Sequence, residues 1–172
     1  MSLSPRTKIL LLDGYNIMRR VAELNIDPAT KLEKQRDDFA RQIASWQRTH
    51  GFRGRIYIIF DGRESVSRGK DYDTLHGITC IYSHLKEEAD GRILSIVRGA
   101  EKPEEIAVVS DDNEIINNAR ALGASVQPAS LFNPEQKSAR KPGSKPHGEG
   151  KQIDQATAHS INAHLKKIWN IT

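Results

Sequence analysis

The sequence predicts an α/β domain in which helices cover both faces of a mainly parallel sheet of roughly five strands. Short apolar runs alternate along the chain with segments whose apolar residues recur at helical spacing, which is typical of repeated strand–helix units. Three of these runs, at residues 9–12, 56–60 and 106–109, are apolar almost throughout. Strands of that composition are buried on both faces, as they are in a parallel sheet. The expected architecture is therefore three layers: helices, sheet and helices.

The first half of the chain is predicted to contain two strands and one long helix. A strand at residues 8–12 leads through a polar connection into a helix at 28–49, and a second strand follows at 55–60. Asp27 can cap the helix, and Pro28 suits its first turn because proline needs no backbone donor there. Four apolar side chains recur on one face of this helix: Leu32, Phe39, Ile43 and Trp46.

The second half repeats the alternation in shorter units. A glycine-, serine- and charge-rich stretch at residues 62–76 is predicted to be a surface loop. The elements after it are a strand at 78–82, a helix at 87–97, a strand at 105–109, a helix at 112–122 and a short strand at 124–126. Pro103 separates one helix from the next strand, and Gly123 ends the last helix.

Length and composition describe a soluble protein with one main domain. The 172 residues are 37% apolar and 28% charged, which is ordinary for a globular chain with a single core. No segment approaches the roughly 18 continuous apolar residues of a membrane span, and residues 1–8 lack the pattern of a signal peptide. One cysteine, Cys80, permits neither an intramolecular disulfide nor a cysteine-based zinc site, and its apolar neighbours indicate a structural thiol. We therefore expect a cytoplasmic protein without membrane contact.

The charge distribution favours a polyanionic partner. The formal charge is +4, and acidic residues gather where the predicted strands end, whereas basic residues fall in the connections. The candidate contacts for a nucleic-acid backbone lie in two of these connections: Arg63, Arg68, Lys70, Lys137, Arg140, Lys141, Lys145 and Lys151. A negative centre with positive surroundings suits a phosphodiester held near metal ions, although the solvated loops of other proteins show the same distribution.

The predicted domain covers residues 1–132, and the composition changes after it. Residues 133–150 are rich in proline, glycine and lysine, cannot build a core, and are predicted to form an extended basic linker. Helical periodicity resumes at 151–172, with apolar anchors such as Ile161 and Leu165. We expect this last helix to dock on the same domain; docking on a partner chain is the alternative.

Aspartates come at or just after the ends of three of the predicted strands. Asp13, Asp61 and Asp111 each come where an apolar run ends. The carboxyl ends of parallel strands meet at one edge of an open α/β sheet, and ligands bind outside that edge. Because carboxylates brought together there repel one another unless cations lie between them, the sequence indicates a metal-dependent site.

Each of these acids, taken singly, also has a structural explanation. The Asp–Gly pairs at residues 13–14 and 61–62 are turn signals, and Asp112 can cap the helix that follows it. The glutamates at 87–88 suit the start of a helix because of its dipole. Asp90 is explained less easily in this way, since it lies a turn into that helix.

Four short motifs occur in the order found in NYN domains. They are Asp13-Gly14-Tyr15-Asn16, Phe60-Asp61-Gly62, Glu88-Ala89-Asp90 and Val109-Ser110-Asp111. Among these PIN-like ribonucleases, the chain is most similar to the YacP-like branch, which residues 123–124 and 129–132 also resemble. The resemblance covers roughly residues 8–132. It implies a PIN-like fold, a divalent metal site and RNA cleavage.

The resemblance also implies roles for individual residues. Asp13, Asp90 and Asp111 match acidic positions of the family site and would be metal ligands. Asn16 matches its amide position and would orient a ligand, a water molecule or the scissile phosphate, which completes a catalytic set of four. Further candidate ligands are Asp61, Glu87 and Asp112. Tyr15 would either stack on an RNA base or pack in the core, and the sequence leaves both roles open.

All of these candidate ligands are oxygen donors. That donor set favours Mg²⁺ or Mn²⁺ over zinc, and the six histidines are scattered along the chain. Two such cations about 4 Å apart activate water and stabilise the leaving oxygen in a phosphodiester displacement. No glycine-rich phosphate-binding motif is present, so we expect no nucleotide cofactor.

The hypothesis that unites these observations is a Mg²⁺- or Mn²⁺-dependent ribonuclease whose partner is RNA. Two alternatives stay open: a non-catalytic RNA- or ribosome-binding module with a vestigial acidic pocket, and a nuclease that acts on single-stranded or flap DNA. The sequence does not specify the RNA target, the endo- or exonucleolytic mode, or the oligomeric state.

Overall fold

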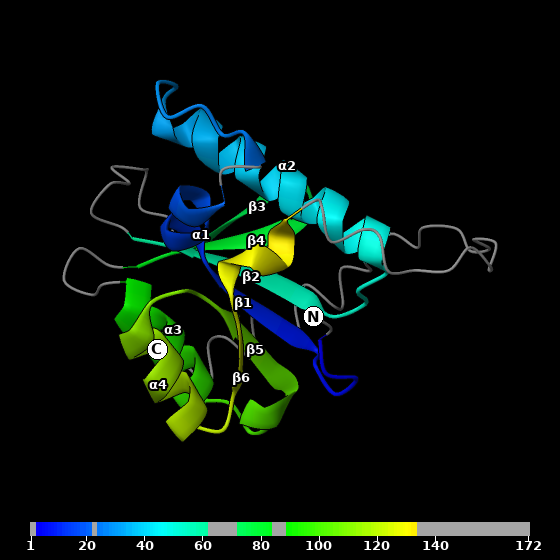
Figure 1. Cartoon of the computed structure of the whole chain (residues 1–172), viewed down its shortest axis with the longest axis vertical. Helices are drawn as coiled ribbons and strands as arrows, with labels where there is room; N and C mark the ends of the chain where they lie inside the picture. Colours follow the sequence, from blue (N-terminus) through cyan, green and yellow to red (C-terminus); the bar gives the residue numbers. More distant parts are fainter. Residues whose placement is uncertain (1–2, 22–23, 62–71, 84–88, 134–172) are drawn as a thin grey trace. The chain divides into compact units, whose positions relative to one another are not determined.

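A computed structural model describes residues 3–21, 24–61, 72–83 and 89–133 (Figure 1). These residues belong to one compact unit, Met1–Gln136, and a second unit covers Lys137–Thr172. From residue 134 onward, the predicted linker and C-terminal helix lie outside the described residues and stay predictions.

The sheet has six strands in the order β3-β4-β2-β1-β5-β6. They are β1 Ile9–Asp13, β2 Arg55–Phe60, β3 Tyr72–Leu75, β4 Ile78–Tyr82, β5 Ile106–Val109 and β6 Ser125–Gln127. Every neighbouring pair is parallel except β3 and β4, which are antiparallel. This confirms the α/β class with a mainly parallel sheet. Figure 1 shows β1 and β2 in the middle of the sheet, where both faces are covered.

Helices cover the sheet on both faces. The α-helices are α1 Gly14–Arg20, α2 Leu32–His50, α3 Ala89–Arg98 and α4 Asn113–Ala121, and two short 3₁₀ helices are η3 Pro103–Glu105 and η4 Ala129–Phe132. Figure 1 shows α1 and α2 on one face and α3 and α4 on the other, which confirms the three-layer arrangement. Among the described residues, no helix is both long enough and apolar enough to cross a membrane.

The structure corrects the predicted loop at 62–76. Its last part, Tyr72–Leu75, forms β3 and pairs with β4 across a turn at His76 and Gly77, both of which have positive φ. The strand is short, polar and exposed at the edge of the sheet, so it has no apolar run that would reveal it. The sheet consequently has one strand more than the five expected.

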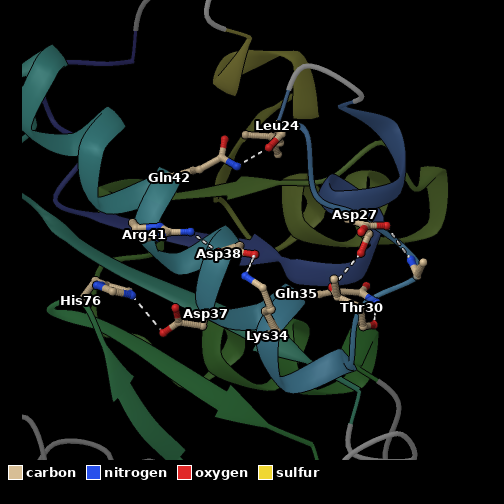
Figure 2. Close-up of polar contacts among 11 residues, drawn as sticks. Leu24, Asp27, Thr30, Lys34, Gln35, Asp37, Asp38, Arg41, Gln42 and His76 are labelled. Carbon is tan, nitrogen blue, oxygen red and sulfur yellow. Dashed lines mark hydrogen bonds and ion pairs between the residues drawn. The ribbon is translucent and has the colours of Figure 1, made fainter.

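The structure also corrects the connection between the first strand and the long helix. A helix of seven residues, α1, begins directly after β1, whereas the sequence predicted only a polar connection. The long helix α2 begins at Leu32, and Asp27 does not cap it. The Asp27 carboxylate instead accepts a hydrogen bond from the Ala29 N–H at 2.9 Å, and its carbonyl oxygen accepts one from Thr30 (Figure 2). Asp27 therefore stabilises a turn, which aspartate does as readily as it caps helices.

Polar contacts on α2 form both within the helix and between it and other elements (Figure 2). Asp38 forms ion pairs with Lys34 and Arg41 of the same helix. Asp37 reaches His76 Nε2 at 2.9 Å and so connects α2 to the β3–β4 hairpin. Exposed pairs of this kind contribute little to stability individually, so we attribute the position of α2 mainly to its buried face.

The predicted apolar faces of the helices pack against the sheet. Two of the four side chains expected on α2, Phe39 and Ile43, are fully buried, and Leu32 and Trp46 are half-buried. Four apolar residues of α3 are likewise buried: Ala89, Ile93, Ile96 and Val97. Cys80 is buried in β4, and burial raises the pKa of its thiol to about 12, as expected of a structural cysteine.

Gly14 allows α1 to lie directly on the sheet. A Cβ atom at this position would lie 2.5 Å from Cε1 and 2.6 Å from Cδ1 of the Phe60 ring, well inside van der Waals contact. Phe60 is itself fully buried at the end of β2. Gly14 is therefore needed for close packing and not for a turn. It begins a helix and does not have the positive φ that a turn glycine often adopts.

We expect Gly14→Ala to lower the free energy of unfolding by roughly 1–3 kcal/mol, because the added methyl group overpacks the contact with Phe60. Urea unfolding followed by circular dichroism measures this change. Ser45→Ala on the exposed face of α2 is the control and should change stability by less than about 0.5 kcal/mol. A Gly14→Ala protein as stable as the control would contradict the packing argument.

Candidate active site

The parallel pairing of β1 with β5 places two polar side chains together at the carboxyl edge of the sheet. Leu12 pairs with Val109, so the residues that follow, Asp13 and Ser110, lie beside each other. Ser110 Oγ donates a hydrogen bond to Asp13 Oδ2 at 3.0 Å. Ser110 is completely buried and Asp13 is 7% exposed. The centre of the site is thus a nearly buried carboxylate.

The other carboxylate oxygen of Asp13 is bonded by the start of α1. Asp13 is the N-cap of this helix, and Asn16 N–H donates to Asp13 Oδ1 at 3.3 Å. An aspartate is well suited to this position because its oxygen satisfies a helix N–H that has no partner within the helix. Both oxygens of Asp13 are therefore held by donors, one from each neighbouring element.

A chain of hydrogen bonds continues from Asn16 to the far side of the site. Asn16 Oδ1 accepts from Asp111 N–H at 3.2 Å. Asp111 Oδ1 in turn accepts from Ala129 N–H at 3.1 Å, at the first residue of η4. Asp111 thus connects the edge of β5 to the segment after β6 through one of its two oxygens.

Asp112 has the structural role that its position suggested. Its carboxylate accepts from Glu114 N–H at 2.8 Å and from Ile115 N–H at 3.3 Å, which caps α4. Its own N–H donates to Ser110 Oγ at 3.1 Å. Ser110 therefore bridges Asp112 and Asp13, and the Asp112 charge remains near enough to act on Asp13.

The environment of Asp13 raises the pKa of its carboxyl group to about 6, from an ordinary value of 3.8. Burial is the largest cause, because it removes water from the charged form. Hydrogen bonds from Ser110 and Asn16 oppose the rise, and repulsion from Asp90 and Asp112 adds to it. The negative potential that the sequence predicted at this edge is thus present around Asp13.

The remaining candidate ligands that the structure describes lie on or beside other elements of the domain. Asp90 lies in the first turn of α3, and Asp61 is half-buried directly after β2. Glu87 lies outside the described residues. Within the described part of the chain, no three acids, histidines or cysteines are close enough together to hold a metal ion between them. The acids around Asp13 repel it electrostatically without forming a finished coordination shell.

The donor chemistry at the site nevertheless suits a hard divalent cation. Asp13 and Asp111 are carboxylates whose orientation is fixed by hydrogen bonds to one oxygen or both, as is common for metal ligands. No histidine or cysteine takes part in the network of hydrogen bonds described above. An oxygen-only set of this kind is typical of Mg²⁺ or Mn²⁺ sites.

Tyr15 packs in the core, which was one of the two roles left open. It is 9% exposed, its ring lies 5.1 Å from that of Phe60, and its hydroxyl accepts a hydrogen bond from Arg36 Nε at 2.9 Å. Base stacking by this ring is therefore not supported. The guanidinium of Arg36 also lies over the rings of Phe60 and Tyr82, at 5.4 and 5.2 Å from their centroids.

The basic residues predicted to contact a nucleic-acid backbone all lie outside the described residues: Arg63, Arg68, Lys70, Lys137, Arg140, Lys141, Lys145 and Lys151. Ser110, by contrast, was present in a motif but received no predicted role. Its signal was a small hydroxyl residue placed directly after a buried strand and before two aspartates. Only the pairing of β1 with β5 reveals that it contacts Asp13.

Comparison with known proteins relates this arrangement to one family. A family model described as the YacP-like NYN domain matches residues 10–170. A relative from Bacillus subtilis (strain 168), named uncharacterized protein YacP, is 32% identical over 85 residues, which are 49% of this chain and 48% of that protein. The chain thus spans about half the length of the curated relative that it matches.

Two crystal structures of Rae1 (YacP) from Bacillus subtilis are similar in fold. One, of a single-residue mutant, has a TM-score of 0.61 and 22% sequence identity and covers 95% of this chain and 85% of that chain. The other has a TM-score of 0.60 and 23% identity and covers 93% and 80%. At these identities the likeness shows the fold alone.

The raised pKa of Asp13 predicts a specific pH dependence of stability in the absence of divalent cations. Asp13 binds its proton more tightly in the folded than in the unfolded protein, so its ionisation destabilises the fold as pH rises from about 4 through about 6. Asp13→Asn cannot ionise. The free energy of unfolding of this variant relative to wild type should therefore rise by at most about 3 kcal/mol between pH 4 and pH 7.

Urea unfolding across this pH range, with a chelator present, measures the difference. Glu104→Gln, which removes an exposed carboxylate in η3, is the control and should show no such trend. A difference between Asp13→Asn and wild type that is the same at every pH would show that Asp13 ionises normally.

Proposed function

The chain belongs to the YacP-like NYN domain family, whose role is nucleolytic or RNA-related, and we propose that it is a Mg²⁺- or Mn²⁺-dependent ribonuclease. The observation that carries this proposal is the nearly buried Asp13. Its two oxygens are oriented by Ser110 and Asn16, and the negative charges of Asp90 and Asp112 act on it. Such a perturbed acid at the carboxyl edge of an α/β sheet is characteristic of functional sites.

The proposal assigns the metal to carboxylates around Asp13. Asp13 would be the central ligand, with Asp90 and Asp111 beside it and Asp61, Glu87 and Asp112 as further candidates. When bound, the cation supplies an activated water and stabilises the negative charge on the departing oxygen. Because a cation offsets the repulsion among these acids, it would also restore the pKa of Asp13 toward its ordinary value.

The protein residues prepare the site in distinct ways. Ser110 and Asn16 hold the Asp13 carboxylate in one orientation, so that little reorganisation is needed when it acts. Asn16 also fixes the backbone at Asp111. The buried surroundings of Asp13 lower the local dielectric constant, which strengthens its attraction for a cation. The substrate is proposed to be RNA, because the family role is RNA-related.

One observation favours the second candidate, a non-catalytic RNA- or ribosome-binding module. The described residues contain no three acids gathered at metal-binding distance. Such a module would retain the acidic pocket without using it. Catalysis in the presence of added metal decides between the two candidates.

The first test is cleavage of labelled RNA, and of single-stranded DNA in parallel, with Mg²⁺, Mn²⁺ or chelator. We expect RNA to be cleaved only with metal, and Asp13→Asn to reduce the rate by orders of magnitude while the protein stays folded. Glu104→Gln is the matched control, because it removes a carboxylate in η3, just before β5 begins and so at the opposite edge of the sheet. Its rate should equal that of wild type.

Each contrary result has a defined meaning. Metal-dependent cleavage that Asp13→Asn leaves unchanged would place the activity elsewhere or in a contaminant. RNA binding without cleavage under any metal condition would support the non-catalytic module. Cleavage of DNA in preference to RNA would change the substrate while leaving the site as proposed.

A further prediction concerns Ser110 as a positioning residue. Ser110→Ala removes the hydroxyl that orients Asp13 Oδ2, so we expect metal affinity or cleavage rate to fall about 10–100-fold. Because this hydrogen bond lowers the pKa of Asp13, its loss should raise that pKa further. NMR titration of the Asp13 carboxyl carbon reads this shift directly. If the cleavage rate fell with no change in the pKa of Asp13, Ser110 would act only through the fold.

A further inference from the structure

One face of α1 carries both an active-site residue and two exposed cations. Asn16, Arg19 and Arg20 are three and four positions apart, so they share a face of the helix. At about 100° per residue, Asn16 lies between the two arginines around the helix axis. The rest of the helix surface includes Gly14, Tyr15 and Ile17, which are all buried.

The hydrogen bonds of Asn16 show where this face points. Asn16 Oδ1 accepts from Asp111 N–H, so the face is turned toward the carboxyl edge of the sheet. Arg19 and Arg20 lie about one helical turn, or roughly 5.4 Å, farther along the axis. Because Cα–Cβ bonds of an α-helix tilt toward its N-terminus, both arginine side chains leave the helix on the side of the end that Asp13 caps.

Several exposed cations of the described elements form no ion pair, among them Arg53 and Arg55, and the two arginines of α1 belong to this group. Both are exposed, and neither forms an ion pair or a side-chain hydrogen bond with another described residue. On α2, by contrast, Lys34 and Arg41 are both neutralised by Asp38. The positive charge of the α1 face is therefore available to a ligand beside the acidic site.

We infer that Arg19 and Arg20 bind the RNA backbone next to the phosphodiester that the acidic site takes. This inference rests on the proposed function and adds residues to it that the basic loops do not include. A guanidinium presents a planar pair of donors that matches phosphate geometry, and an exposed pair pays little desolvation on binding. The RNA strand would thus run from the acidic site around Asp13, where cations would hold one phosphate, to the face of α1 that carries the two arginines.

A competing explanation for the two arginines is the helix dipole. Both lie in the last turn of α1, where cations stabilise a helix by a few tenths of a kcal/mol to about 1 kcal/mol. That role predicts an effect on stability and none on RNA affinity. Binding measurements therefore separate the two explanations.

The test uses the full chain in an Asp13→Asn background, which prevents cleavage during the measurement. Affinity for a short labelled single-stranded RNA is measured by fluorescence anisotropy over roughly 50–200 mM salt. The test variant adds Arg19→Gln and Arg20→Gln. Its matched control adds Arg53→Gln and Arg55→Gln, two exposed arginines at the start of β2, at the opposite edge of the sheet. Both variants lose two positive charges.

We expect the test variant to bind RNA more weakly than its parent does. Its log–log salt slope should flatten by about 0.7 for each phosphate that the protein no longer neutralises, or by about 1.4 for two. The control should keep the slope of its parent. Equal slopes in all three proteins would overturn the inference, because the α1 arginines would then neutralise no phosphate. Equal flattening in both variants would also overturn it, because the effect would then follow from total charge and not from the position of the arginines on α1.

In the cleavage-competent protein, Arg19→Gln with Arg20→Gln should raise the KM for RNA while kcat changes little. The binding result does not depend on catalysis. If RNA is bound through the α1 face but never cleaved, only the proposed ribonuclease activity fails. If RNA is cleaved and the slope does not change, only the assignment of these arginines fails.

Discussion

The parallel pairing of β1 with β5 is the constraint on which the candidate site depends. The two strands are far apart in sequence, yet their register ends with Leu12 beside Val109. The next residue on each strand is polar, so the Ser110 hydroxyl meets the Asp13 carboxylate at the edge of the sheet. A shift of the register by one residue would direct these side chains to opposite faces and separate them. Every other contact in the network extends from this pair.

The second requirement is the position of α1, which a helix of seven residues cannot hold by itself. Three contacts with the rest of the domain replace intrinsic helix stability. Gly14 packs directly against Phe60, Ile17 is buried in the core, and the Tyr15 hydroxyl is bonded by the buried Arg36 of α2. Because α1 carries Asn16, these packing contacts also determine the geometry around Asp13.

The sequence predicted the elements that have a strong apolar signal and missed those that do not. The continuous apolar strands β1, β2 and β5 were evident, and the family resemblance is confirmed by the match over residues 10–170. The strand β3 was missed because it is polar and exposed, and α1 because its Asp–Gly start resembles a turn. Contacts such as that of Ser110 with Asp13 depend on strand pairing, which local patterns do not encode. For the candidate ligands, the sequence predicted which residues come at the end of a strand, but it did not predict which side chains they contact.

Asp13 caps α1, but its buried negative charge destabilises the fold. This cost distinguishes a functional role for the charge from the capping role. As an N-cap, asparagine would do about as well as aspartate, and it would carry no charge into a buried position. The carboxylate here is buried, repelled by Asp90 and Asp112, and only partly compensated by the hydrogen bonds from Ser110 and Asn16. Capping therefore explains why a polar residue stands at position 13 but does not explain the charge. A ligand that brings positive charge to this edge would explain it, since the same burial that raises the pKa of Asp13 strengthens its attraction for a cation.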